Sequence, residues 1–221
     1  MKNPGSRILL IAWVTGIALQ AFAQEATPSP TPRFPPLSVE AKTAAQQGMT
    51  AFQSGDLDSA RLAFEKMRGL SPGHPMALIN LGTILFQQGK LDQAAEMLQQ
   101  ATVIAPDSAE AWTFLGMVFV RQEKFDEALA ALARSQVIDP NNPRTHNYLG
   151  VTVGRKGWFD GAEAELRRAL ELDPKYADAQ FNLTLIYLQR DPPDLELAKY
   201  HYQKAIALGA PPDDSVAKQL K

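Results

Sequence analysis

Residues 112–140 read WTFLGMVFVRQEKFDEALAALARSQVIDP, and several of their features return at a fixed distance along the chain. The closing proline belongs to a series with a spacing of 34 residues: Pro72, Pro106, Pro140 and Pro174. A Leu-Gly pair keeps the same step, at Leu81-Gly82, Leu115-Gly116 and Leu149-Gly150. A fixed period of this length predicts an array of one small unit instead of a single globular core.

Five units fit the chain when each closing proline is placed at position 32 of its unit. They start at Ala41, Pro75, Ala109, Pro143 and Ala177. Each unit reads as two amphipathic helices joined by a short turn, so the expected fold class is all-α. The prolines are expected to stop each second helix, and Pro75 and Pro143 suit the first turn of the helix that follows.

Small residues recur at the two positions where the helices of one unit should touch. Position 8 is Gly48, Gly82, Gly116 and Gly150, with Thr184 in the fifth unit. Position 20 is Ala60, Ala94, Ala128, Ala162 and, after a two-residue insertion, Ala198. Bulky residues at position 24 are expected to fill the adjacent space. A larger side chain at the glycine positions should therefore overpack the contact and cost about 1–3 kcal/mol.

The turns inside the units carry two further periodic residues. Position 15 holds Gly55, Gly89 and Gly157, where glycine can end a helix in the left-handed conformation. Position 18 holds Asp58, Asp92, Asp126 and Asp160. Aspartate at the start of a helix accepts hydrogen bonds from free amides, so we expect these residues to cap the second helices instead of binding metal.

The N-terminal segment has the features of an export signal. Lys2 and Arg7 precede an apolar run over residues 8–19, and Ala21-Phe22-Ala23 forms an A-x-A cleavage pattern. We expect residues 1–23 to be a signal peptide, with an uncleaved anchor as the alternative, and residues 24–38 to be a proline-rich linker. The expected location is periplasmic or secreted. The absence of cysteine excludes a lipidated N-terminal Cys.

The periodic pattern resembles the tetratricopeptide repeat family, whose units read W-x2-L-G-x2-Y, then A-x3-F, then P. Trp112 to Phe119, Ala128 to Leu132 and Pro140 match it closely. The resemblance covers residues 39–210, with units at about 41–74, 75–108, 109–142, 143–176 and 177–210. It implies a right-handed superhelical solenoid, lined on its inner face by the first helices. The first and fifth units depart from the pattern. Residues 211–221 are expected to be a short tail or a partial capping helix.

The resemblance also implies a groove that binds a segment of a partner protein. The family's groove positions carry a mixed set of side chains here: Met49, Phe52, Met76, Asn80, Phe86, Phe114, Met117, Arg121, Arg144, Tyr148, Phe181 and Asn182. Methionine and aromatic residues give adaptable apolar contact, and asparagine can bond both groups of a peptide backbone. The alternative for the apolar members is that they only pack between first helices. The Lys and Asn clamp with which some members hold a partner's C-terminal carboxylates is absent.

Composition and motifs exclude several other functions. A net charge of -2 without a basic tract gives no electrostatic reason to bind nucleic acid. There is no G-x-S-x-G, H-E-x-x-H or phosphate loop, so we expect no enzyme activity and no cofactor or metal. His74, His146 and His201 are widely separated and are predicted to be surface or groove residues. The charges at Glu163, Glu165, Arg167 and Arg168 are predicted to form a solvated helix face.

Two functional hypotheses remain open from the sequence. The leading one is a non-enzymatic adaptor in the bacterial cell envelope, with a protein or peptide partner and no stable membrane span after cleavage. The alternative is a self-associating structural module, or an accessory subunit of an envelope assembly, secretion or pilus complex. A homo-oligomer would form through the last second helix, where Leu195, Tyr200, Ile206 and Leu208 are expected to stay uncovered.

Overall fold

The computed structural model describes residues 34–220, so the predicted signal peptide and most of the predicted linker lie outside the described residues. Residues 34–38 are not helical, and the first helix begins after its N-cap, Ser38. The described part of the chain is all-α, and its helices are α1 (Val39–Gln53), α2 (Leu57–Leu70), α3 (Pro75–Gln87), α4 (Leu91–Ile104), α5 (Ala109–Arg121), α6 (Phe125–Ile138), α7 (Pro143–Arg155), α8 (Phe159–Leu172), α9 (Ala177–Gln189), α10 (Leu195–Ala207) and α11 (Asp214–Gln219).

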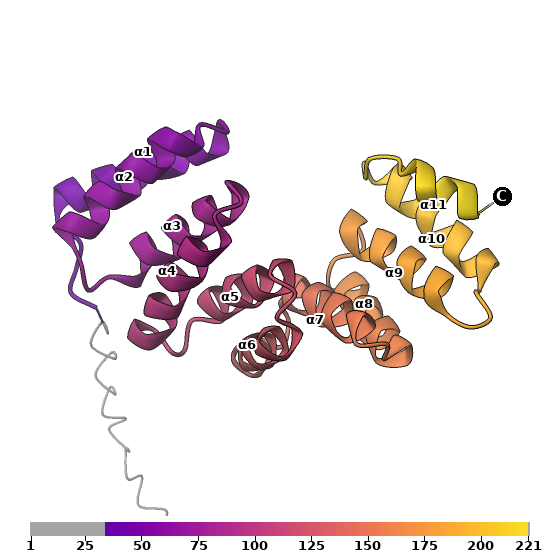
Figure 1. The fold of residues 1–221 in the computed structure, drawn as a ribbon. Helices are drawn as coiled ribbons and strands as arrows, with labels where there is room; N and C mark the ends of the chain where they lie inside the picture. The colour runs from indigo at the N-terminus through magenta and orange to yellow at the C-terminus, as the bar shows by residue number, and fades with distance from the viewer. Residues whose placement is uncertain (1–33, 221) are drawn as a thin grey trace, which may run out of the picture. The chain divides into compact units, whose positions relative to one another are not determined.

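The helices pack in chain order as five helix-turn-helix units. The closest packing is within each pair, α1 with α2 through α9 with α10, and each second helix also contacts the first helix of the next unit. First helices additionally contact one another, α3 with α5, α5 with α7 and α7 with α9 (Figure 1). The prediction of an all-α array of stacked units is therefore confirmed. Pro75 and Pro143 occupy the first turns of α3 and α7, as predicted.

Close approach of the two helices in a unit depends on glycine, as predicted. A Cβ atom placed on Gly116 would lie 2.5 Å from Cγ of Leu132, and one on Gly82 would lie 2.5 Å from Cγ of Leu98. Real Cβ atoms essentially never approach that closely, so any larger residue would require the leucine or its helix to shift. The fifth unit has a buried Thr184 at this position.

The turn inside each unit passes through the left-handed backbone region. Gly55, Gly89 and Gly157 have φ values of 80°, 73° and 82°, which confirms the role predicted for position 15. In the third unit the same position is Glu123, and its φ of 59° is the single positive value among non-glycine residues between 34 and 220. The turn is therefore kept in the third unit although the residue that best suits it is missing.

The prediction that the position-18 aspartates cap the second helices is wrong. The N-cap residues of α4, α6 and α8 are Lys90, Lys124 and Trp158, and none makes a side-chain cap bond. The aspartates lie inside the first turn of the helix, after the N-cap, and bind the next unit instead. Their partners, 30 residues further along, are Gln88 for Asp58, Gln122 for Asp92, Lys156 for Asp126 and Arg190 for Asp160. We call these four contacts the junction bonds.

The prediction that the helical histidines are surface or groove residues is also wrong. His146 is buried, with Nδ1 2.7 Å from Glu165 Oε2 and Nε2 2.9 Å from the backbone oxygen of Pro140. His201 is buried, stacks on Tyr187 and lies 2.7 Å from Gln180 Oε1. Their polar neighbours come from other turns or helices, which the spacing within one helix does not reveal. His74 lies at the start of α3 and accepts a bond from the amide of Met76.

The predicted solvated face on α8 holds only in part. Arg168 is exposed and pairs with Glu171 on the same helix. Glu163 and Glu165 are half-buried, and Glu165 pairs with His146 of α7. Arg167 donates a hydrogen bond to the hydroxyl of Tyr187 on α9. These charges therefore join helices that follow one another in the stack.

Candidate functional site

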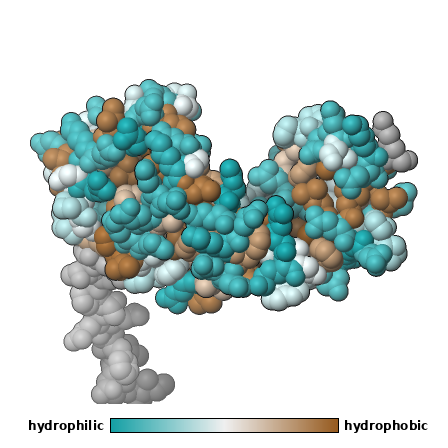
Figure 2. Space-filling model, in the orientation of Figure 1, coloured by the Kyte–Doolittle hydropathy of each residue, from teal (hydrophilic) through white to brown (hydrophobic). Residues whose placement is uncertain are grey.

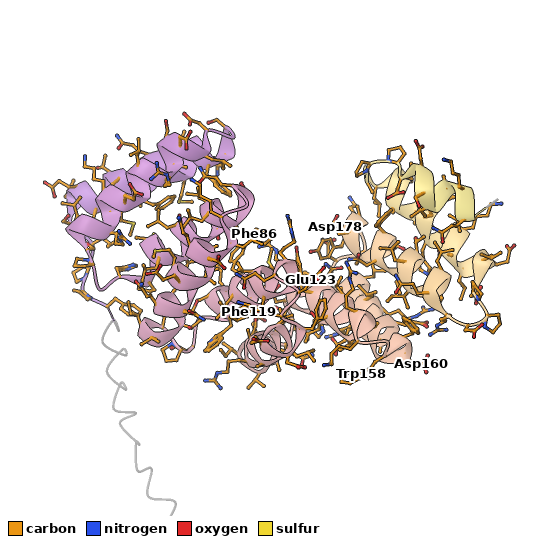
Figure 3. The ribbon with its side chains drawn as sticks, viewed as in Figure 1. Phe86, Phe119, Glu123, Trp158, Asp160 and Asp178 are labelled. Atoms are coloured by element: carbon orange, nitrogen blue, oxygen red, sulfur yellow. The ribbon has the colours of Figure 1, made fainter. Side chains whose placement is uncertain are left out.

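A cavity of about 400 Å³ lies where α5, α7 and α9 follow one another. Each of the three first helices contributes to its wall, and Glu123 contributes from the turn after α5. Figure 3 labels Glu123 and Asp178, the two carboxylates of this cavity. The lining residues are Val120, Arg121, Glu123, Asn147, Tyr148, Val151, Arg155, Asp178, Phe181 and Asn182. We call this the inner cavity.

An asparagine pair spans two helices in the inner cavity. Nδ2 of Asn182 on α9 donates to Oδ1 of Asn147 on α7, over 2.9 Å. Asn147 is buried, whereas Asn182 is half-buried. The bond leaves the carbonyl oxygen of Asn182 and the amide group of Asn147 without a partner in the described structure. Together they present one acceptor and one donor, the pair that a peptide backbone requires.

Two arginines beside the inner cavity rest on aromatic rings of the preceding unit. The guanidinium carbon of Arg121 lies 5.5 Å from the ring centre of Phe86, and that of Arg144 lies 5.3 Å from the ring centre of Phe114. Both distances are within the range of a cation–π interaction. Such contacts restrict the two side chains without neutralising their charges.

The hydroxyl groups of Tyr148, in the inner cavity, and of Tyr176, in a neighbouring hollow, have raised pKa values. Burial raises the pKa of Tyr148, and the charge of Asp178 adds to the shift while Arg144 and Arg121 oppose it. Burial, with Tyr148 and Asp178, raises the pKa of Tyr176 to about 12. Both groups are therefore neutral hydrogen-bond donors at neutral pH. The same causes show that Tyr148 lies within electrostatic range of charges of both signs.

The charged side chains of the inner cavity do not neutralise one another. Arg121, Glu123, Arg155 and Asp178 line one space, yet within residues 34–220 none of them forms an ion pair. Elsewhere in the same units, charges are paired, as in the bonds of Arg190 to Asp160 and Glu163. The inner cavity thus keeps two positive and two negative groups available.

The structure brings four of the twelve predicted groove residues into the inner cavity: Arg121, Tyr148, Phe181 and Asn182. Phe86 and Phe114 support the two arginines, and Arg144 lines a neighbouring hollow with Tyr176. Met117 is buried on α5. The remaining predicted groove residues lie in the first two units: Met49, Phe52, Met76 and Asn80.

These remaining members differ in exposure. Met49 and Met76 are exposed, whereas Phe52 packs against the core of the first unit. The amide of Asn80 donates to the backbone oxygen of Met76, in its own helix, over 2.8 Å. The groove prediction overlooked Glu123. The signal was present in the sequence, because the third unit has glutamate where the first, second and fourth have glycine.

Other kinds of site have no support in the described structure. Between residues 34 and 220 no three His, Asp or Glu side chains gather closely enough to hold a metal ion. None of the helices in that range has the length and the apolar character to cross a bilayer. In the view of Figure 2, hydrophobic residues form separate patches among hydrophilic ones.

Models of the tetratricopeptide repeat match residues 51–118, 85–151 and 150–215, which together make up well over half of the chain. The chain therefore belongs to the tetratricopeptide repeat family, as the periodic residues predicted. A search of the curated proteins gives no match.

Solved structures show the same fold at low sequence identity. The Thermus thermophilus protein TTC0263, a thermophilic tetratricopeptide protein, is 24% identical with a TM-score of 0.68, over 81% of this chain and 96% of that one. MamA from Desulfovibrio magneticus is 18% identical with a TM-score of 0.65, over 78% and 97%. YrrB, described as having an unusual peptide-binding site, is 20% identical with a TM-score of 0.59, over 82% and 96%.

Proposed function

We propose that the protein is a non-enzymatic adaptor of the bacterial cell envelope and that the inner cavity binds a segment of a partner protein. Its family is one of protein-interaction modules. The observation that carries the proposal is the set of polar and charged groups without an ion-pair partner that line one cavity on the first helices. An amide donor and an acceptor, two aromatic rings and four unpaired charges line the same space of about 400 Å³.

The shape of this site suits an extended segment better than a small molecule. The lining comes from three successive first helices, so the site continues along the stack from the third to the fifth unit. Val120, Val151 and Phe181 offer apolar contact between the polar groups. Peptide recognition commonly combines backbone hydrogen bonds with side-chain pockets in this way.

Partner capture with matched variants tests the groove. Residues 24–221 are immobilised and exposed to a cell-envelope extract, and bound proteins are identified by mass spectrometry. Tyr148→Ala should lose a specific partner that the unaltered protein retains. Trp158→Ala, which removes an aromatic residue that is 56% exposed outside the inner cavity, should retain it. Equal recovery with the folded Tyr148→Ala variant would contradict the proposal.

The envelope location rests on the sequence of residues 1–23, and it has its own test. A C-terminally tagged full chain is produced in bacteria, which are then fractionated. We expect the tagged protein outside the cytoplasm, with an N-terminus at Gln24. Recovery in the cytoplasm with Met1 intact would contradict this part of the proposal and leave the groove untouched.

Self-association is the second candidate function, favoured by the apolar surface of α10. Leu195, Tyr200 and Leu208 have exposed fractions of 49%, 52% and 36%. The capping helix α11 has six residues and buries only Val216 among its own side chains. Light scattering of residues 24–221 at increasing concentration should show a dimer that Leu195→Ser weakens. A monomer at all concentrations would contradict it.

A further inference from the structure

We propose that the segment bound in the inner cavity carries one basic and one acidic side chain, and that Glu123 selects the basic one. Glu123 and Asp178 would contact the basic group, and Arg121 and Arg155 the acidic group. This inference rests on the proposed peptide-binding function and adds the chemistry of the partner to it.

The first argument is the backbone of Glu123. Its φ of 59° is in the left-handed region, where three other units have glycine at the same position. Most side chains are disfavoured in that region because Cβ comes too close to the following carbonyl oxygen. Residues held in unfavourable backbone regions are concentrated at functional sites. The carboxylate of Glu123 forms no ion pair within residues 34–220, and it adds a negative charge to the cavity wall.

The second argument is the contrast between paired and unpaired charges. Where charged groups stabilise the stack, they are bonded, as with Lys156 to Asp126 and Arg190 to Asp160. The side chains of Glu123, Asp178, Arg121 and Arg155 make no ion pair within residues 34–220. Because the two signs are equal in number, a partner with a single charge would leave the two side chains of the other sign unpaired. A partner with both charges satisfies both sets.

The third argument is that the site is organised before binding. The contact with Phe86 restricts the guanidinium of Arg121. The Asn182–Asn147 bond fixes the two amides at 2.9 Å. Groups already ordered in the free protein lose less conformational entropy when a ligand arrives. The apolar side chains Val120 and Phe181 lie among the charges and leave a place for an uncharged residue of the segment.

Binding of four synthetic peptide pools tests the assignment. The pools are dye-labelled decapeptides, random among uncharged residues, with a fixed Lys and Glu, a fixed Lys only, a fixed Glu only, or neither. Fluorescence anisotropy with residues 24–221 should show the tightest binding for the pool that carries both, by about tenfold over the uncharged pool. Equal binding of all four pools would overturn the inference.

Glu123→Gly is the decisive variant because its effects on folding and binding are expected to be opposite. Glycine suits the left-handed turn, so the variant should be at least as stable as the unaltered protein. Its affinity for both Lys-containing pools should fall about tenfold, while the Glu-only pool should bind unchanged. Arg121→Gln should lower the affinity for both Glu-containing pools and leave the binding of the Lys-only pool unchanged. Glu127→Gln, a change of an exposed carboxylate on α6, should alter neither.

The outcomes separate this inference from the proposed function. If Tyr148→Ala loses its envelope partner but Glu123→Gly binds the Lys and Glu pool normally, the inner cavity is still the binding site and the charge assignment is overturned. If Tyr148→Ala keeps every partner that the unaltered protein binds, the proposed function of the inner cavity is contradicted. Displacement of the peptides by free glutamate and lysine at equal concentration would show a small-molecule site, and would also overturn the assignment.

Discussion

The third unit (residues 109–142) and the fifth unit (residues 177–210) have different residues at the equivalent contacts within and between units. In the third unit, Gly116 lies against Leu132, and the junction bond is the amide of Gln122 donating to Asp92 over 2.8 Å. In the fifth unit, Thr184 replaces the glycine, and the junction bond comes from Arg190.

The buried polar groups of the two units differ in the same way. Thr113 and Ser135 of the third unit meet Thr145 in a cluster of hydroxyls with oxygen distances of 2.7, 2.9 and 3.1 Å. The fifth unit has instead the ionisable His201, 2.7 Å from Gln180. The comparison teaches that the period preserves the order in which the helices pack, while the residues that make the contacts change from unit to unit. Stability of the third unit should therefore depend on packing, and that of the fifth unit on salt and pH.

The largest expected effect comes from placing valine at position 8 of each unit. Gly116→Val puts side-chain atoms where Leu132 already lies, so it should lower the free energy of unfolding by about 3 kcal/mol. Thr184→Val has nearly the same shape and loses only the hydroxyl bond to the backbone of Gln180, so we expect about 1 kcal/mol. Urea denaturation measures both. Equal losses would show that glycine is not what sets the packing of the third unit.

A smaller effect is expected from the junction bonds. Arg190 donates to Asp160 and Glu163 over 2.8 and 2.7 Å, and Arg190→Gln should cost about 1 kcal/mol at low salt. The loss should shrink when salt screens the charges. Gln122→Ala should cost about 0.5 kcal/mol, with less dependence on salt. Thermal unfolding at two salt concentrations measures the salt dependence of both losses. An identical salt dependence for Arg190→Gln and Gln122→Ala would contradict this prediction.

The smallest effect is expected from mild acid, through His201 of the fifth unit. Burial lowers the pKa of His201 from its ordinary value of 6.5, the charge of Arg167 lowers it further, and Glu163 opposes the shift. The unfolded chain therefore binds a proton before the folded chain does. The contribution of His201 to stability is complete above pH 6.5 and is lost as the pH falls through the folded pKa. Hydrogen exchange of α9 and α10 on acidification measures this loss, which His201→Gln should remove.

Stronger acid should act where the fourth unit contacts the fifth, through Glu163 of α8, which accepts a bond from Arg190. Burial alone would raise the pKa of this carboxyl, but bonds from Tyr187 and Arg167 and the charges of Arg167 and Arg190 together hold it below 4.5. This contribution is present above pH 4.5 and is lost as the pH falls through the folded pKa. Arg190→Gln should reduce the loss. An unchanged acid profile in that variant would contradict the role given to the ion pairs.

The period was sufficient to predict the fold because the residues that keep it, such as Gly116 and Pro140, act on their own unit. The junction bonds were missed because their partners are 30 residues apart, and Asp58 at a helix start looks like a cap when its own unit is read alone. The burial of His201 was missed for the same reason, since Tyr187 lies on another helix. In the candidate site, Arg121 and Asn182 follow from the family's groove positions. Glu123 does not, because its conformation is set by a turn that the other units form with glycine.

The even spacing of the junction bonds has a consequence for how the gene for such a chain can change length. Each bond joins position 18 of one unit to position 14 of the next, so every unit offers the same two attachment points to its neighbours. An in-frame deletion of residues 109–142 would bring Asp92 opposite Lys156 and exchange an amide bond for an ion pair. The shortened protein would keep a continuous stack, because units in such arrays contact only their neighbours. It would lose Arg121 and Glu123 together, so recombination between units could weaken both charge preferences of the inner cavity in a single step and leave a folded chain.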